Sequence, residues 1–281
     1  MTDHGSPARL AVLGSPIAHS KSPALHRAAY DVLGLPWTYD AIEVADGGLD
    51  RFVAGLDPSW RGLSLTMPLK REVLPLLYSR SPLVEQVGAA NTVHLRDGKL
   101  HGFNTDVAGI TAVFRENHVE ALESVQILGG GATAASVLAA VAQLGATRAL
   151  VMARDAEKAR SLEPVAAAAG IELTVRPLGM MDRSMIVPSA VISTLPGGTV
   201  LDVSYPEAVR HRAVLLDVAY DPWPSELASS WVAAGGTVIS GLGMLLHQAI
   251  AQVRIFVTGM EDGELDRETE VVAAMRAAVA G

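Results

Sequence analysis

Short runs in which apolar and polar residues alternate recur along the first part of the chain. They are separated by stretches with helical spacing. The alternation predicts strands at residues 37–44 and 62–66, and a short apolar run predicts another at 9–13. Between them, helical spacing predicts a helix that ends near Gly34 and a short one at 49–55. Strands that alternate with helices in this way are typical of βαβ units, so we expect an open α/β sheet.

A predicted hairpin follows, at residues 88–102, with Asp97-Gly98 at its turn. Asn91 and Asn104 stand at opposite ends of this hairpin, and we therefore expect them to lie close together. A helix should begin near Asp106. That aspartate is equally well explained as the N-cap of the helix or as a functional residue.

The second part of the chain opens with an apolar strand at residues 125–128 and continues into an alanine-rich helix. Gly129, Gly131 and Ala134 form the pattern G-x-G-x-x-A between the two. In this context the first glycine permits a tight turn, the second lets a pyrophosphate approach the backbone, and the alanine permits close helix packing. The candidate cofactor residues of this loop are Gly129, Gly130, Gly131 and Ala132.

The next strand, at residues 149–152, is followed by Arg154, where a site selective for NAD would carry an acid. Arg154 and Lys158, one helical turn apart, could hold the 2′-phosphate of NADP. Asp155 and Glu157 could instead pair with these cations at the surface. The pattern favours NADP over NAD without excluding NAD.

Later strands are predicted at residues 190–194, 214–218 and 237–240, and their ends should line the cofactor crevice. The last long helix should begin at Gly241, with Met244 and Gln248 on one face; Met244 is as well explained by a core position. The candidates from these segments are Thr194, Val218, Gly241 and Met244.

A single lysine follows the third predicted strand. Pro68 removes a ladder donor and ends the pairing, so Thr66 and Lys70 should lie at the carboxyl end of the strand, where ligand crevices form in open α/β sheets. Ser20 and Ser22 stand in a hydroxyl-rich loop before the first helix. Ser22 precedes a proline, so its simplest role is as the N-cap.

Composition and charge narrow the class of protein. The 281 residues suffice for two domains, and 49% hydrophobic but only 5% aromatic residues with 26 glycines are typical of α/β proteins. A net charge of −8 disfavours nucleic acid and anionic membrane surfaces, which leaves a small-molecule partner. The absence of cysteine excludes disulfides, thiolate metal sites and a cysteine nucleophile. Neither a leader peptide nor a long apolar run is evident, so we expect a soluble cytoplasmic protein without a metal site.

Five short segments together resemble the motifs of the shikimate dehydrogenase family. They occur in the family's order, at residues 14–23, 65–70, 88–92, 104–106 and 241–248. The resemblance implies a substrate-binding domain at residues 1–106, a Rossmann-like NADP-binding domain at 107–240, and C-terminal helices at 241–281 that return to the first domain. It also implies NADPH-dependent, reversible reduction of 3-dehydroshikimate to shikimate, a step toward the aromatic amino acids.

In the family, the residues that match Lys70 and Asp106 form the catalytic pair. The residues that match the substrate-binding positions are Ser20, Ser22, Thr66, Asn91, Tyr220 and Gln248. Ser64 stands where many members have asparagine, and Ala132-Thr133 where Gly-Ala is usual.

Other functions would share parts of this pattern. An NAD-preferring quinate/shikimate dehydrogenase would share the substrate contacts, and a non-catalytic NADPH-binding regulator would be expected to lack the lysine, the aspartate or the serine loop. A serine hydrolase is disfavoured because the chain has no G-x-S-x-G motif. Both a monomer and a homodimer fit the sequence.

Overall fold

The computed structural model of the protein describes residues 5–179, 187–201 and 203–280. The chain forms two compact units. Unit 1 comprises Met1–Thr105 and Leu245–Gly281, and unit 2 comprises Asp106–Met244. The predicted boundaries follow residues 106 and 240, whereas the chain passes between the units after Thr105 and after Met244. Residues 1–4, on which the expected absence of a leader peptide partly rests, lie outside the described residues.

Unit 1 is built on a mixed sheet of six strands among its described residues. In sheet order these are β2 (Trp37–Glu43), β1 (Ala8–Gly14), β3 (Trp60–Leu65), β5 (Thr92–Arg96), β6 (Lys99–Phe103) and β4 (Ser79–Arg80). The first three strands are parallel to one another, as the alternation of strands and helices predicts. The predicted hairpin is also present, as β5 and β6, and β5 runs antiparallel to β3.

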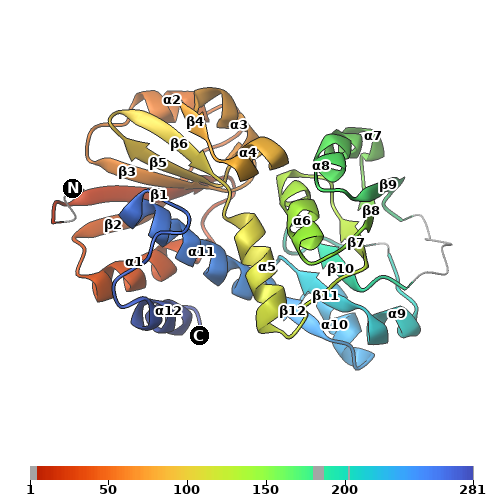
Figure 1. Ribbon diagram of the computed structural model, residues 1–281. Coiled ribbons are helices and arrows are strands. Elements are labelled where there is room, and N and C mark those ends of the chain that lie inside the picture. Colours follow the sequence, from red (N-terminus) through yellow and green to blue (C-terminus); the bar gives the residue numbers. More distant parts are fainter. Residues whose placement is uncertain (1–4, 180–186, 202, 281) are drawn as a thin grey trace. The chain divides into compact units, whose positions relative to one another are not determined.

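Helices cover both faces of this sheet (Figure 1). On one side lie α2 (Leu49–Ala54), α3 (Leu69–Glu72) and α4 (Pro82–Val87), and on the other α1 (Ser22–Leu33), α11 (Gly241–Thr258) and α12 (Glu268–Ala277). A 3-10 turn, η1 (Leu74–Leu76), follows α3. The C-terminal helices belong to this unit because α12 packs on α1 and α11 packs on β3. At the second contact a Cβ on Gly62 would lie 2.3 Å from the Phe256 ring, so only glycine fits.

Unit 2 is built on a parallel sheet, also of six strands among its described residues. In sheet order they are β12 (Val238–Ser240), β11 (Val214–Asp217), β10 (Ala190–Ser193), β7 (Ser124–Leu128), β8 (Arg148–Ala153) and β9 (Glu172–Pro177). Counted from β7, this is the order 3-2-1-4-5-6 of the Rossmann fold, and the predicted fold class is confirmed. Its helices are α5 (Asp106–Glu116), α6 (Ala132–Gln143), α7 (Ala156–Ala159), η2 (Arg160–Leu162), α8 (Glu163–Ala168), α9 (Glu207–Arg212) and α10 (Glu226–Ala233).

Of the helices in the described part of the chain, none combines the length and the apolar character needed to cross a membrane.

Candidate functional site

The loops that follow β1 and β3 are joined at the carboxyl ends of these strands in unit 1. The amide of Thr66 donates to the carbonyl of Leu13 at 2.9 Å, and the amide of Ser15 donates to the carbonyl of Met67 at 2.9 Å. A Cβ on Gly14 would lie 2.3 Å from the Thr66 methyl group, so glycine permits this close approach. The hydroxyl-rich loop after β1 therefore runs beside Thr66.

Lys70 lies in the short helix α3, not in an open loop as expected from the strand end alone, and only 9% of its surface is exposed. Its carbonyl accepts from the amide of Ala90 at 2.8 Å, and the amide of Leu65 donates to the carbonyl of Asn91 at 2.7 Å. These bonds hold the lysine segment against the start of the hairpin.

The two serines lie at the amino end of α1. Ser22 is buried and is already the first residue of the helix, whose N-cap position is Lys21 without a capping side chain. The prediction that Ser22 caps the helix is therefore wrong, because the helix begins one residue earlier than the Ser-Pro pair indicates. Instead, the Ser20 hydroxyl accepts from the amide of Ser22 at 3.3 Å.

Asn91 joins the two ends of the hairpin to α11. Its amide N–H donates to the carbonyl of Phe103, which confirms that the ends lie together. Its side-chain oxygen accepts from the amide of Thr105 at 2.8 Å, and its side-chain nitrogen donates to Gln248 Oε1 at 3.1 Å. Asn104, at the other end, donates to the carbonyl of Ala89 at 2.9 Å. Asp106 follows Thr105 directly and begins α5; its pairing with Lys70 stays a prediction.

In unit 2 the three glycines after β7 have different surroundings. Gly129 has φ +105°, and a Cβ on it would lie 2.4 Å from Thr194 Oγ1. A Cβ on Gly130 would lie 2.7 Å from that of Ala159, so the first two glycines are required by the protein itself. Gly131 is the N-cap of α6, and a Cβ there would meet nothing within 4 Å. The backbone at Gly131 is therefore open to a phosphate at the amino end of a 12-residue helix.

The carboxyl ends of the neighbouring strands meet beside this loop. Thr194 Oγ1 donates to the carbonyl of Leu128 at 2.9 Å, and the amide of Val218 donates to that of Ser193 at 3.0 Å. A Cβ on Gly241 would lie 2.0 Å from the carbonyl oxygen of Val218. Thr194, Val218 and Gly241 thus follow adjacent strands of one edge, whereas Met244 is buried, which fits the core explanation.

Arg154 and Lys158 are exposed beyond the end of β8. Glu157 pairs with Arg160 at 3.3 Å, and Asp155 caps α7 by accepting from the backbone amide of Lys158 at 2.9 Å. Within the described ranges, neither acid forms an ion pair with Arg154 or with the Lys158 ammonium. Both cations are therefore available to an anionic group. Tyr220 follows β11 in the same unit, while the remaining predicted substrate residues belong to unit 1.

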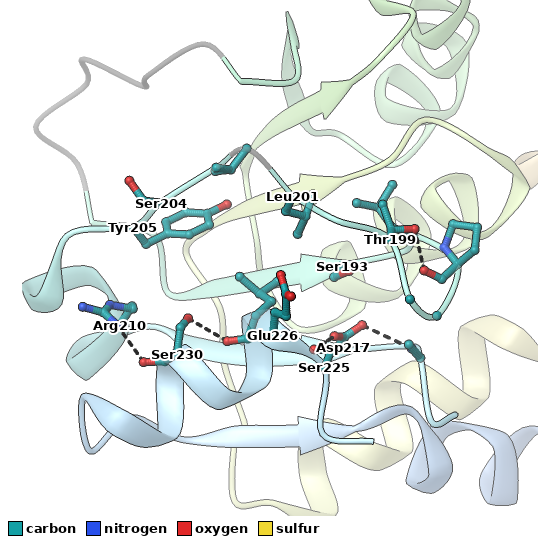
Figure 2. Close-up of a pocket in the computed structure, with 17 residues that line it drawn as sticks. Ser193, Thr199, Leu201, Ser204, Tyr205, Arg210, Asp217, Ser225, Glu226 and Ser230 are labelled. Atoms are coloured by element: carbon teal, nitrogen blue, oxygen red, sulfur yellow. Dashed lines mark hydrogen bonds between the residues drawn. The ribbon is translucent and has the colours of Figure 1, made fainter. Parts of the chain in front are cut away.

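A hollow of about 290 Å³ in unit 2 lies beside β10 and β11 (Figure 2). Asp217 on its wall is 2% exposed and accepts from the Ser225 hydroxyl at 2.6 Å, and burial raises the pKa of this carboxyl. None of the predicted site residues lines the hollow. Ser193 and Asp217 do line it, and Thr194 and Val218 come directly after them, where the side chains of extended backbone point to the opposite face.

Two buried polar residues of unit 1 are not among the predicted site residues. His26 in α1 is fully buried and Gln252 in α11 is 3% exposed. The available signal was the spacing of Gln252, four residues after Gln248, which places both amides on one side of the helix.

Comparison with known proteins identifies relatives along nearly the whole chain. Residues 12–93 match the family model described as "Shikimate dehydrogenase substrate binding domain". A shikimate dehydrogenase (NADP(+)) of Citrifermentans bemidjiense is 34% identical over 270 residues, which cover 91% of this chain and 92% of that protein.

Two solved structures are also similar. The crystal structure of Mycobacterium tuberculosis shikimate dehydrogenase is 36% identical, with a TM-score of 0.80 over 96% of this chain and 100% of that one. The Thermus thermophilus shikimate 5-dehydrogenase in complex with NADP(H) and shikimate is 28% identical, with a TM-score of 0.77 over 97% and 100% of the two chains.

Proposed function

Because this chain belongs to the shikimate dehydrogenase family, we propose that it catalyses the NADPH-dependent, reversible reduction of 3-dehydroshikimate to shikimate. The observation that carries the proposal is the extent of the match: 34% identity over 91% of the chain with an enzyme of that name, at nearly equal length. The reaction needs a site for the substrate and a site for the dinucleotide, and the chain has residues suited to each.

Unit 1 has the residues for a polar, carboxylated substrate. Ser20 and Ser22 stand at the amino end of α1, where the helix dipole and the hydroxyl groups favour a carboxylate. Thr66, Asn91 and Gln248 come from segments that backbone and side-chain hydrogen bonds hold together. We assign these five residues, with Tyr220 from unit 2, to the substrate carboxylate and ring hydroxyls.

Lys70 and Asp106 are proposed as the catalytic pair. Reduction of a ketone places a hydride on carbon and a proton on oxygen, so a cationic donor is needed where the alkoxide develops. The Lys70 ammonium stabilises that charge and passes its proton to the oxygen, an effect worth roughly 10²–10⁴-fold in rate. Asp106 orients the ammonium and accepts a hydrogen bond from a substrate hydroxyl.

The residues of unit 2 fit a dinucleotide. When bound, NADPH supplies the hydride that becomes the new C–H bond of the product. The open backbone at Gly131 receives the pyrophosphate, and the remaining loop positions, Gly129, Gly130 and Ala132, shape the turn. Thr194, Val218 and Gly241 are assigned to the nicotinamide side, whereas the buried Met244 is left as a core residue.

The preference for NADP is assigned to Arg154 and Lys158. Asp155, the acid nearest to the end of β8, already accepts from the backbone amide of Lys158 as the cap of α7. The exposed guanidinium of Arg154 therefore faces no competing carboxylate within the described residues and suits a 2′-phosphate. Because the chain has no cysteine, it suits a reducing compartment, and we place the activity in the cytoplasm.

One assay tests the function: absorbance at the reduced-nicotinamide band with shikimate or quinate, each crossed with NADP or NAD. We expect turnover with shikimate and NADP to exceed the other three combinations by at least about tenfold, or 1.4 kcal/mol. A strong preference for NAD would contradict the role of Arg154, and turnover with none of the four pairs would contradict the proposed function.

A further inference from the structure

A chain of buried side-chain hydrogen bonds crosses unit 1, from α1 to the start of the hairpin. Tyr30, His26, Gln252 and Thr92 are its successive members, and each is 3% exposed or less. Tyr30 Oη lies 3.2 Å from His26 Nδ1, and His26 Nε2 lies 3.1 Å from Gln252 Oε1. The Gln252 side-chain nitrogen donates to Thr92 Oγ1 at 3.1 Å.

The hydrogen bonds of this series all donate in the same direction, from Tyr30 toward Thr92. Ser64 Oγ donates to Gln252 Oε1 at 2.9 Å, and the Gln252 nitrogen faces the Asn91 backbone carbonyl at 3.4 Å, an acceptor only, which identifies Oε1 as the amide oxygen. His26 Nε2 therefore carries the proton, and Nδ1 accepts from Tyr30. Burial lowers the pKa of His26 to about 3, in keeping with a neutral ring. Rotation of the Gln252 amide by 180° would turn its oxygen toward the backbone carbonyl of Asn91, which can only accept, so the observed orientation is the favourable one.

Hydrogen bonds connect the Gln252 side-chain amide to the predicted substrate residues Asn91 and Gln248. Thr92 Oγ1, which accepts from Gln252, donates to Asn91 Oδ1 at 2.8 Å. The backbone amide of Thr105 donates to the same oxygen at 2.8 Å. With its oxygen held by both donors, Asn91 turns its nitrogen toward Gln248 Oε1 at 3.1 Å. Gln248 is left with its amide nitrogen, which no hydrogen bond engages within the described residues.

We propose that Gln252 is a positioning residue, which acts through Thr92 and together with the Thr105 amide to hold Asn91 and Gln248 so that Gln248 presents N–H donors to oxygen atoms of the substrate. This inference rests on the proposed function and adds a residue that does not itself touch substrate. The coupling follows from hydrogen-bond direction: each amide in the series has its acceptor occupied by the donor before it.

The same network gives Ser64 a structural role. Its hydroxyl accepts from Tyr39 at 2.6 Å and donates to Gln252 Oε1, so its single proton is already used inside the protein. The serine thereby holds Gln252 from the β3 side.

Steady-state kinetics of two Gln252 variants test the proposal. Gln252→Met keeps the shape and removes every hydrogen bond, whereas Gln252→Glu keeps the acceptor for Ser64 and His26 but turns an acceptor toward Thr92. In both we expect KM for shikimate to rise at least tenfold, with KM for NADP unchanged and kcat within about threefold. A role in packing alone would leave the nearly isosteric glutamate variant with an unchanged KM.

The matched control is Gln126→Met, which removes a buried glutamine from unit 2, where its nitrogen contacts the sulfur of Met152. We expect this variant to keep the wild-type KM for shikimate. Thr92→Val provides a second test that leaves Gln252 in place, and if the Gln252 variants fail to fold, it decides the question. A KM for shikimate within twofold of wild type in Thr92→Val, or in a folded Gln252→Glu, overturns the proposal. An inactive wild-type enzyme would instead overturn the proposed function.

Discussion

Lys70 combines a charged side chain with a nearly buried position, which is uncommon for lysine unless the amine has a specific partner or task. The helix that carries it has only four residues, and its backbone is tied to the hairpin at Ala90. The side chain is thus attached to a rigid base, as a group that meets a reacting atom requires.

We expect Lys70→Ala to lose most of kcat, by roughly 10²–10⁴-fold, with little change in KM for shikimate. The reason is that the ammonium acts on the charge that develops during the reaction, while the ground-state contacts come from other residues. Stopped-flow or steady-state turnover with shikimate and NADP measures the effect. Near-wild-type turnover would remove Lys70 from its catalytic role.

At the scale of the element, the turn between β7 and α6 separates two uses of glycine. Gly130 is enclosed by protein atoms, with Ala159 in the way of a Cβ, whereas Gly131 faces open space at the helix N-cap. The first requirement comes from packing and the second from a ligand that approaches the backbone.

Gly131→Ser should therefore affect cofactor binding, whereas Gly130→Ser should affect stability. Serine is a favourable N-cap, so Gly131→Ser should preserve stability but raise KM for NADP about tenfold or more by obstructing the pyrophosphate. Gly130→Ser should lower stability by about 1–3 kcal/mol through overpacking. Thermal unfolding and cofactor titration distinguish the two variants, and an unchanged affinity for NADP in Gly131→Ser would place the pyrophosphate elsewhere.

At the scale of the whole molecule, two buried histidines make stability depend on pH. Burial lowers the pKa of His26 to about 3 and that of His94 to about 4, from 6.5 in both cases. Their stabilising contribution is fully present above pH 6.5, where both states are neutral. This contribution is lost as the pH falls, because both histidines bind a proton in the unfolded chain at a pH at which they are still neutral in the folded protein.

We expect the free energy of unfolding to decrease between pH 6.5 and pH 4, with His26 alone contributing up to about 1.4 kcal/mol per pH unit. Denaturant unfolding, followed by tryptophan fluorescence, to which the buried Trp37, Trp60 and Trp231 contribute, measures this at several pH values. The curve for His26→Gln should be shallower than that for wild type by about one proton. Parallel curves would show that His26 is not held neutral.

Part of the structure of this protein could be predicted from the sequence alone. Alternation predicted β2 and β3, and a short apolar run predicted β1. Asp97-Gly98 predicted the hairpin turn, and the glycine pattern predicted the turn before α6, where Gly129 does adopt positive φ. These features depend on residues a few positions apart, so neighbouring residues contain the information.

Tertiary structure decided which distant segments meet. The edge strand β9 was not predicted, although its residues alternate between polar and apolar, and Ser22 fails as a cap because α1 begins a residue earlier. Neither the close packing of Gly62 on Phe256 nor the bond from His26 to Gln252, 226 residues away, leaves a local signal. Such contacts depend on the combined packing of helices and sheet, and the orientation of each buried amide depends on which donors surround it after folding.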